Sequence, residues 1–146
     1  MVADEVGFAV VAGLEASSLV VRLSFGTQDF CFQGDIGKVQ ERQLARLEAG
    51  HDCEAYLVGH HGSAGASNEA WLSAMAPEVA VVSFGENTYG HPTPAALCRV
   101  QQVGAKVYAT HRLGTVSVGT DGHTLRVSPD RPEALDYCAE GASYWP

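Results

Sequence analysis

The sequence has few charged residues, few aromatic residues and no long apolar run. Charged residues make up 18% of its 146 residues and aromatic residues make up 8%. No apolar run approaches the ~18 residues that a membrane-spanning helix needs, so we expect no transmembrane segment in this chain. The first residues also lack the basic region and the long apolar core of a signal peptide.

Basic residues are scarce as well. The sequence has 9 Lys and Arg against 17 Asp and Glu, which gives a formal net charge of −8. A surface of this sign repels nucleic acid unless metal ions or another segment reverse the local field. The charge therefore disfavours a simple DNA-binding module. Hydrophobic residues, at 46%, are numerous enough for one globular domain with its own core.

The cysteines lie far apart in the sequence. Cys31, Cys53, Cys98 and Cys138 form no C-x-x-C pair, which argues against a structural zinc site because such sites use closely spaced pairs. Most of them lie in apolar or helical surroundings, where a free, buried thiol is the expected state. Their even number leaves disulfides possible if the protein is exported.

Hydrophobic periodicity predicts an α/β fold with a mixed sheet and flanking helices. The middle of the chain alternates strands with helices, which favours parallel strands, and hairpins at both ends add antiparallel ones. The helix at 38–50 has Val39, Leu44 and Leu47 at helical spacing. We divide the chain into a domain at 1–128 and an irregular extension at 129–146. Strands are expected at 17–26, 27–35, 54–60, 78–85, 105–111, 114–122 and 123–128, and helices at 38–50, 67–77 and 93–104.

Three predicted strands are each followed at once by polar residues and glycine. The stretches are "FCFQGDI" with Asp35, "AYLVGHHGS" with His60 and His61, and "AVVSFGENTYGHP" with Asn87 and His91. Parallel strands bring their carboxyl ends to one edge of the sheet, where open α/β sheets bind ligands. A carboxylate and several imidazoles at that edge match the ligands of a zinc or manganese hydrolase.

Each of these residues also has a simpler interpretation. Asp35 follows Gly34 and precedes a helix, as an ordinary turn or helix-capping acid does. A histidine at the end of a strand is usually a surface or core residue, and His91 precedes a proline as many loop residues do. His51, His111 and His123 have no accompanying signal and receive no role.

The order of the motifs resembles the metallo-β-lactamase-type domain of ComEC-family competence proteins, in its C-terminal part. The family pattern runs from an N-x-S strand through L-x-G-D and H-H-G-S to S-x-G-x-x-N-x-Y-G-H-P and G-x-x-V-Y-x-T. The matching blocks here are "FQGDI", "LVGHHGS", "VVSFGENTYGHP" and "GAKVYAT", so the resemblance covers roughly residues 17–122.

The resemblance implies an αββα sandwich with two divalent metal ions, zinc or manganese, between its sheets. Asp35 falls at the position of the metal-bridging carboxylate, and His60 at the position of the last histidine ligand. His61 would orient its neighbour or contact a phosphate, while His91 and Asn87 would lie at the rim and donate to the substrate. His60 is preferred to His61 as the ligand.

The sequence departs from the family at one important place. The family carries an H-x-(H/D)-x-D-H metal motif upstream of the N-x-S strand, and this sequence contains no such motif. Asp35 and His60 alone are too few, because each metal of a catalytic pair needs about three protein ligands. We expect a fragment or a late start of a longer protein, lacking an N-terminal half-domain; a degenerate, inactive domain is the alternative.

The function that the resemblance implies is metal-dependent phosphodiester hydrolysis of DNA during competence, on the extracytoplasmic side of the bacterial membrane. The alternative is a non-catalytic or truncated domain of the same fold that serves packing or partner binding. A plain truncation that cannot hold its core alone is the third alternative: half of a sandwich exposes one apolar sheet face, so such a chain should form a homo-oligomer or aggregate.

Overall fold

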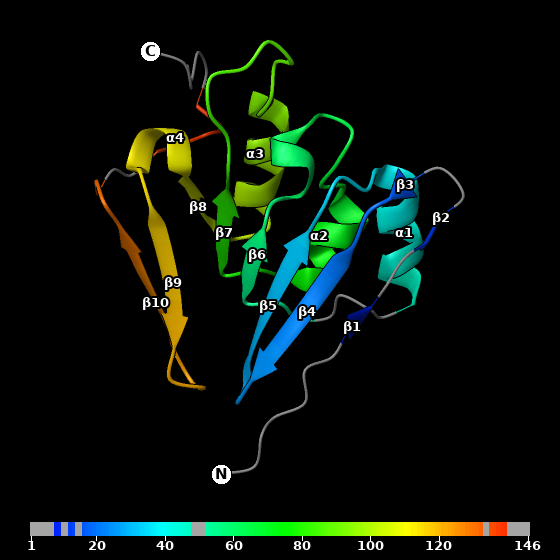
Figure 1. Ribbon diagram of the computed structural model, residues 1–146, viewed down its shortest axis with the longest axis horizontal. Coiled ribbons are helices and arrows are strands. Elements are labelled where there is room, and N and C mark those ends of the chain that lie inside the picture. The colour runs from blue at the N-terminus through cyan, green and yellow to red at the C-terminus, as the bar shows by residue number, and fades with distance from the viewer. Residues whose placement is uncertain (1–7, 10–11, 14–15, 48–51, 133–134, 140–146) are drawn as a thin grey trace.

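A mixed sheet forms the centre of the molecule. The computed structural model describes residues 8–9, 12–13, 16–47, 52–132 and 135–139 (Figure 1). The main sheet has six strands in the order β1-β4-β5-β6-β7-β8, and two further pairs are β2–β3 and β9–β10. The strands are β1 (Phe8–Ala9), β2 (Ala12–Gly13), β3 (Ala16–Ser17), β4 (Val20–Phe25), β5 (Gln28–Gln33), β6 (Ala55–Leu57), β7 (Val79–Val82), β8 (Lys106–Ala109), β9 (Val116–Thr120) and β10 (Leu125–Pro129).

The strand directions confirm the predicted arrangement. β5, β6, β7 and β8 run parallel to one another, and β4 pairs antiparallel with both β1 and β5. The carboxyl ends of β5, β6 and β7 therefore lie at one edge of the sheet, the upper edge in Figure 1.

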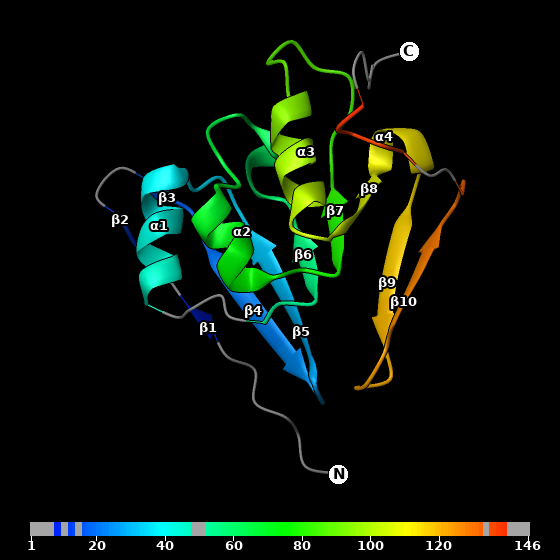
Figure 2. The same cartoon turned by 180° about the vertical axis from the view of Figure 1, so that it is seen from behind.

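Three helices cover one face of this sheet, the face seen from the front in Figure 2. Two of them begin at side-chain caps: Asn68 accepts a hydrogen bond from the N–H of Trp71, and Thr93 accepts one from the N–H of Ala96. The structure also contains α4, a short helix that the sequence analysis did not predict. The helices are α1 (Lys38–Arg46), α2 (Glu69–Met75), α3 (Pro94–Gln102) and α4 (Thr110–Leu113), with a 3₁₀ segment, η1 (Gly59–Gly62).

The buried side of α1 differs from the sequence pattern. Of the three apolar residues at helical spacing, only Leu44 is buried, whereas Val39 is 62% exposed and Leu47 is 74% exposed. Glu41 is fully buried instead. A carboxylate tolerates such a position only when hydrogen bonds replace its hydration, and Glu41 accepts several of them.

The other face of the sheet is only partly covered. The β9–β10 hairpin packs Val116, Val118, Leu125 and Val127 against the side chains of β7 and β8. The part formed by β4 and β5 remains open: Leu23 is 38% exposed, Phe25 is 52% and Phe32 is 42%. A groove of about 230 Å³ separates this open part from β9, between Phe30, Phe32, Leu57, Val81, Val116 and Val118.

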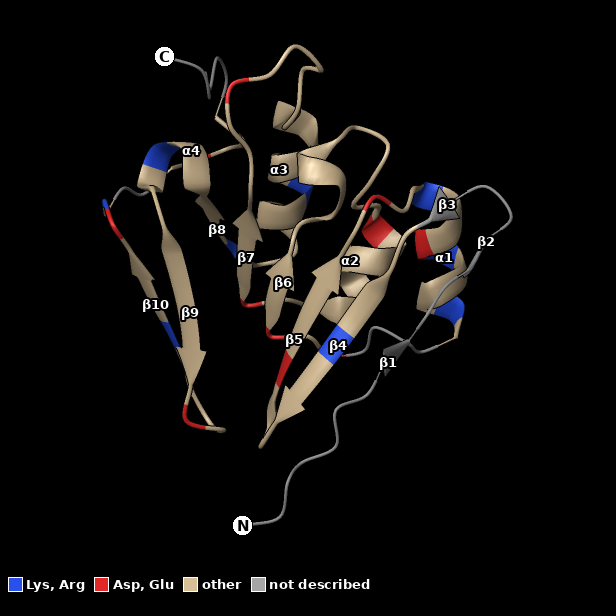
Figure 3. Ribbon diagram, viewed as in Figure 1, with Lys and Arg blue, Asp and Glu red and all other residues tan. Residues whose placement is uncertain are grey.

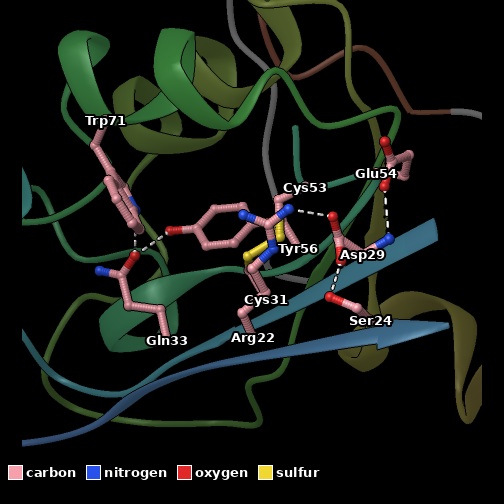
Figure 4. Close-up of a disulfide and its surroundings, with 9 residues drawn as sticks. All are labelled: Arg22, Ser24, Asp29, Cys31, Gln33, Cys53, Glu54, Tyr56 and Trp71. Carbon is pink, nitrogen blue, oxygen red and sulfur yellow. Dashed lines mark hydrogen bonds and ion pairs between the residues drawn. A yellow bond between two sulfur atoms is a disulfide. The ribbon is translucent and has the colours of Figure 1, made fainter. Parts of the chain in front are cut away.

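The interpretation of the cysteines as free thiols is wrong. Cys31 is bonded to Cys53 (Figure 4). Cys98 is bonded to Cys138, and no free cysteine remains among the described residues. The first disulfide links β5 to the segment that enters β6, deep in the core. The second holds residues 135–139, whose backbone is irregular, against α3, and Tyr137 is buried there.

Charge is unevenly distributed. Lys38, Arg42 and Arg46 give α1 a basic surface in a chain that is acidic overall (Figure 3). An ion pair joins Arg22 to Asp29 (Figure 4). Burial raises the pKa of Asp29, but the hydrogen bonds from Arg22 and Ser24 outweigh it and leave this pKa below its ordinary value.

No helix within the described ranges has the length and the apolar character needed to cross a bilayer.

Candidate functional site at the carboxyl edge of the sheet

Three loops follow the carboxyl ends of β5, β6 and β7 and meet at the upper edge of Figure 1. The first loop is joined to the second because the N–H of His60 donates to the carbonyl of Gly34, at 3.2 Å. The second is joined to the third because Nδ1 of His61 lies 2.7 Å from the carbonyl oxygen of Ser83. These loops carry all the predicted site residues: Asp35, His60, His61, Asn87 and His91.

The carboxylate of Asp35 is exposed and forms no hydrogen bond or ion pair within the described part of the chain. Its backbone N–H donates to Oγ of Ser18, at 2.7 Å, which fixes the turn. The simpler interpretation of Asp35 as a helix cap is wrong, because the N-cap of α1 is Gly37 and no side chain caps it. The Asp35 carboxylate is therefore available to a ligand.

The double-histidine turn has an unusual backbone. His60 has φ 47° and ψ 41°, and His61 has φ 50° and ψ 31°. Two consecutive non-glycine residues in the left-handed region cost about 1–2 kcal/mol each. Such strain persists where the surroundings impose it and concentrates at functional sites. The structure thus favours a functional interpretation of "HHGS".

The imidazoles of this edge have distinct surroundings. A carbonyl only accepts hydrogen bonds, so Nδ1 of His61 is the donor in its contact with Ser83, and in the neutral ring Nε2 then has the lone pair. The ring of His60 packs edge-on against that of His91, with centroids 5.4 Å apart. Nδ1 of His91 is buried and has no hydrogen-bond partner among the described residues.

The loop that carries His91 is organised by one side chain. Nδ2 of Asn87 donates to the carbonyls of Gly85 and His91, at 2.9 and 2.7 Å. Its Oδ1 accepts from the N–H groups of Tyr89 and Gly90, both at 3.1 Å. Both amide hydrogens of Asn87 are thus in use, so the predicted donation from Asn87 to a substrate would require one of these bonds to break.

A buried polar network, which the sequence analysis missed, lies beneath the site. Glu41 accepts hydrogen bonds from Gln33, from the N–H of Ser67, and from the backbone and side chain of Asn68. Oε1 of Gln33 accepts from both Tyr56 and Trp71, at 2.7 Å each (Figure 4).

This network also holds the first two loops in place. The hydroxyl of Tyr56 accepts a hydrogen bond from the N–H of Gly59, directly before the histidines. A Cβ atom on Gly59 would lie 2.1 Å from Nε2 of Gln33, so only glycine fits there. Burial raises the pKa of the Tyr56 hydroxyl, which keeps it protonated. Hydrophobic periodicity in the sequence does not predict the residues of this network.

Comparison with known proteins finds two relatives. The chain is 31% identical over 101 residues to ComE operon protein 3 of Bacillus subtilis (strain 168). The matched segment is 68% of this chain and 13% of that protein. The chain is also 36% identical over 104 residues to competence protein ComA of Neisseria gonorrhoeae. The matched segment is 70% of this chain and 15% of that protein.

The chain is similar to a short part of each of these two bacterial proteins. It therefore spans about one seventh of the length of these relatives, or less. No protein-family model matches the chain. No solved structure matches it either.

The donor atoms at this edge suit zinc or manganese in kind but not in number. Asp35 offers carboxylate oxygens and His60 an imidazole, which are ligands of both metals. Across the described residues, however, no group of three His, Cys, Asp or Glu side chains is placed to hold a metal ion. A catalytic metal centre needs about three protein ligands per ion. The described residues alone thus do not complete a dinuclear centre.

A hollow of about 330 Å³ opens beside the histidines. Its residues come from the double-histidine turn and from the loop after β7. They are His61, Ser83, Phe84, Gly85, Glu86, Asn87, Tyr89 and His91.

Proposed function

We propose that this chain forms the C-terminal half of a metallo-β-lactamase-type αββα sandwich in a competence protein. In this proposal the complete domain hydrolyses phosphodiester bonds of DNA, and Asp35 and His60 are two of its metal ligands. The observation that carries the proposal is that the loops of Asp35 and His60 are hydrogen-bonded to each other at the edge where the open sheet face ends.

The open face leads directly to this edge. Phe32, 42% exposed, precedes Asp35 by three positions, and Leu57 precedes His60 by the same number. Exposed, contiguous apolar surface of this kind is typical of an interaction site. A second sheet packed on this face would bring its own loops to the same edge, where they would supply the ligands that the described residues lack.

The relatives support a role in competence. One is named as a protein of the ComE operon and the other as competence protein ComA. DNA uptake is the process in which such a domain would meet DNA. The acidic charge of the chain is compatible with this substrate because divalent cations at the edge would reverse the local field.

The disulfides support a location outside the cytoplasm. The structure holds its described cysteines in two disulfides. Disulfides persist in oxidising compartments and are rare in the cytosol. We therefore place this half-domain on the extracytoplasmic side of the membrane.

The histidines beside the ligands have supporting roles in this proposal. The contact of Nδ1 of His61 with the carbonyl of Ser83 holds the ring in place, so in the neutral ring the Nε2 lone pair is the one available at the edge. His91 fixes the ring of His60 through the edge-on contact. Both residues line the hollow in which the substrate would lie.

Metal binding by the purified chain tests this proposal. We expect isothermal titration with Zn²⁺ or Mn²⁺ to show a site that Asp35→Ala and His60→Ala each weaken by about tenfold or more. His123→Ala and Glu78→Ala are the matched controls, because both residues are exposed and neither lies in the three loops of the edge. We expect these controls to bind like the native chain.

The second candidate function is a non-catalytic domain of the same fold that serves packing or partner binding. The absence of a three-ligand group from the described residues favours it. A folded native chain that binds no metal, or controls that weaken binding as much as Asp35→Ala does, would contradict metal ligation and favour this candidate.

A further inference from the structure

Tyr89 is the most exposed large apolar or aromatic side chain among the described residues. It is 82% exposed, and it lies in the loop that follows β7, on the rim of the hollow beside the histidines. A side chain with this exposure contributes little to packing within the chain. Its aromatic ring is therefore free to contact a ligand.

The backbone around Tyr89 is held in place. The N–H of Tyr89 and that of Gly90 both donate to Oδ1 of Asn87, at 3.1 Å. Nδ2 of Asn87 fixes the two sides of the loop through the carbonyls of Gly85 and His91. An exposed ring on an ordered loop loses less conformational entropy when it binds than a ring on a loose one.

The hollow that Tyr89 borders suits an uncharged, flat group. Phe84, in its lining, stacks on His111 with ring centroids 5.4 Å apart, so one side of the hollow is aromatic. Glu86 is the acidic residue of the lining, and its carboxylate disfavours a phosphate there. The volume of about 330 Å³ lies at the lower end of the range for small-molecule sites.

We propose that Tyr89 is a stacking platform for a base of single-stranded nucleic acid, with the hollow that it borders receiving the base. This inference rests on the proposed function, because DNA is the substrate that it names. Bases stack on exposed aromatic side chains with little regard to sequence. Tyr89 would hold a nucleotide next to the one that reaches His60 and Asp35, so it acts in positioning and not in the reaction itself.

An NMR titration of the native chain tests the proposal. The probe is tetrathymidylate, and its matched control is a tetranucleotide of the same charge without bases. We expect tetrathymidylate to shift the amide signals of Tyr89, Gly90 and His91, and the ring of Tyr89 to move the thymine proton signals upfield. Tyr89→Ala should weaken binding by roughly 5- to 150-fold, the equivalent of one stacked base, whereas Tyr89→Phe should retain it.

Further controls separate this inference from the proposed function. Phe25→Ala removes an aromatic ring that is 52% exposed on the open sheet face, and we expect it to leave tetrathymidylate binding unchanged. Binding at the edge that is equally strong in Tyr89→Ala, or with the probe lacking bases, would overturn the stacking platform and leave DNA binding in place. No signal change with either probe would overturn the stacking platform, whereas the metal titration described above tests the proposed function separately.

Discussion

Glu41→Ala is expected to lower the free energy of unfolding by about 4 kcal/mol, the largest effect of a single substitution that we predict. Glu41 is fully buried, and four donor groups point at its carboxylate, at 2.6–2.9 Å. Alanine would leave these donors buried without an acceptor. Each unsatisfied donor costs about 1–3 kcal/mol, and partial relaxation of the surrounding residues keeps the loss of stability below the sum of these costs. Denaturation with guanidinium, followed by circular dichroism, measures the loss.

Two variants of the same helix control this experiment. Gln43→Ala changes an exposed residue of α1, and we expect it to stay within about 0.5 kcal/mol of the native chain. Glu41→Gln keeps the shape of the side chain but turns an NH₂ group toward the donors. We therefore expect its loss of unfolding free energy to approach that of Glu41→Ala. A loss below about 1 kcal/mol in Glu41→Ala would show that water replaces the carboxylate and that the network does not hold the loops.

Removal of the disulfides is the second large effect that we expect. The bond between Cys31 and Cys53 spans a sequence separation of 22, and that between Cys98 and Cys138 spans 40. In the chain-entropy account, loops of these lengths correspond to about 3 and about 4 kcal/mol of stability, respectively. The double variants Cys31→Ala/Cys53→Ala and Cys98→Ala/Cys138→Ala should lose these amounts in guanidinium denaturation under oxidising conditions.

Graded reduction provides an internal comparison between the disulfides. Cys31 and Cys53 are 1% and 0% exposed, whereas Cys138 is exposed. A dithiol reductant should therefore open the Cys98–Cys138 bond first, which alkylation and mass spectrometry detect. Equal stability of the oxidised chain and of both double variants would contradict a structural role for these bonds.

Much of the fold follows from the sequence because hydrophobic periodicity and turn residues act locally. The strand pattern, Pro94 at the start of α3 and Gly26 in the turn between β4 and β5 predicted elements that the structure contains. The buried side of α1 was not predictable in this way, since Glu41 is buried by donors that come from elsewhere in the chain. Local patterns carry no information on such distant partners.

The cysteines illustrate the same limit. Buried surroundings suit a free thiol and a disulfide equally well. Only the three-dimensional pairing brings Cys31 beside Cys53, with Cα atoms 6.0 Å apart, and Cys98 beside Cys138, at 4.7 Å. Sequence spacing does not encode these distances.

The candidate site was partly predictable. Parallel strand ends, identified by their glycine and polar residues, led to Asp35, His60 and His91, and the loops that carry them meet. The positioning network of Gln33, Glu41 and Tyr56 was not predictable, because polar residues inside strands and helices usually indicate an exposed face. Whether Asp35 and His60 bind a metal stays a prediction.

Line broadening by Mn²⁺ in the NMR spectrum tests the central claim most directly, because the paramagnetic ion broadens signals according to their distance from it. With Mn²⁺ well below the protein concentration, the account predicts that broadening centres on residues 34–36 and 59–61 and is lost in Asp35→Ala. Broadening centred on other carboxylates, such as Asp121 or Asp130, or spread evenly over this acidic chain, would contradict a metal site at Asp35 and His60.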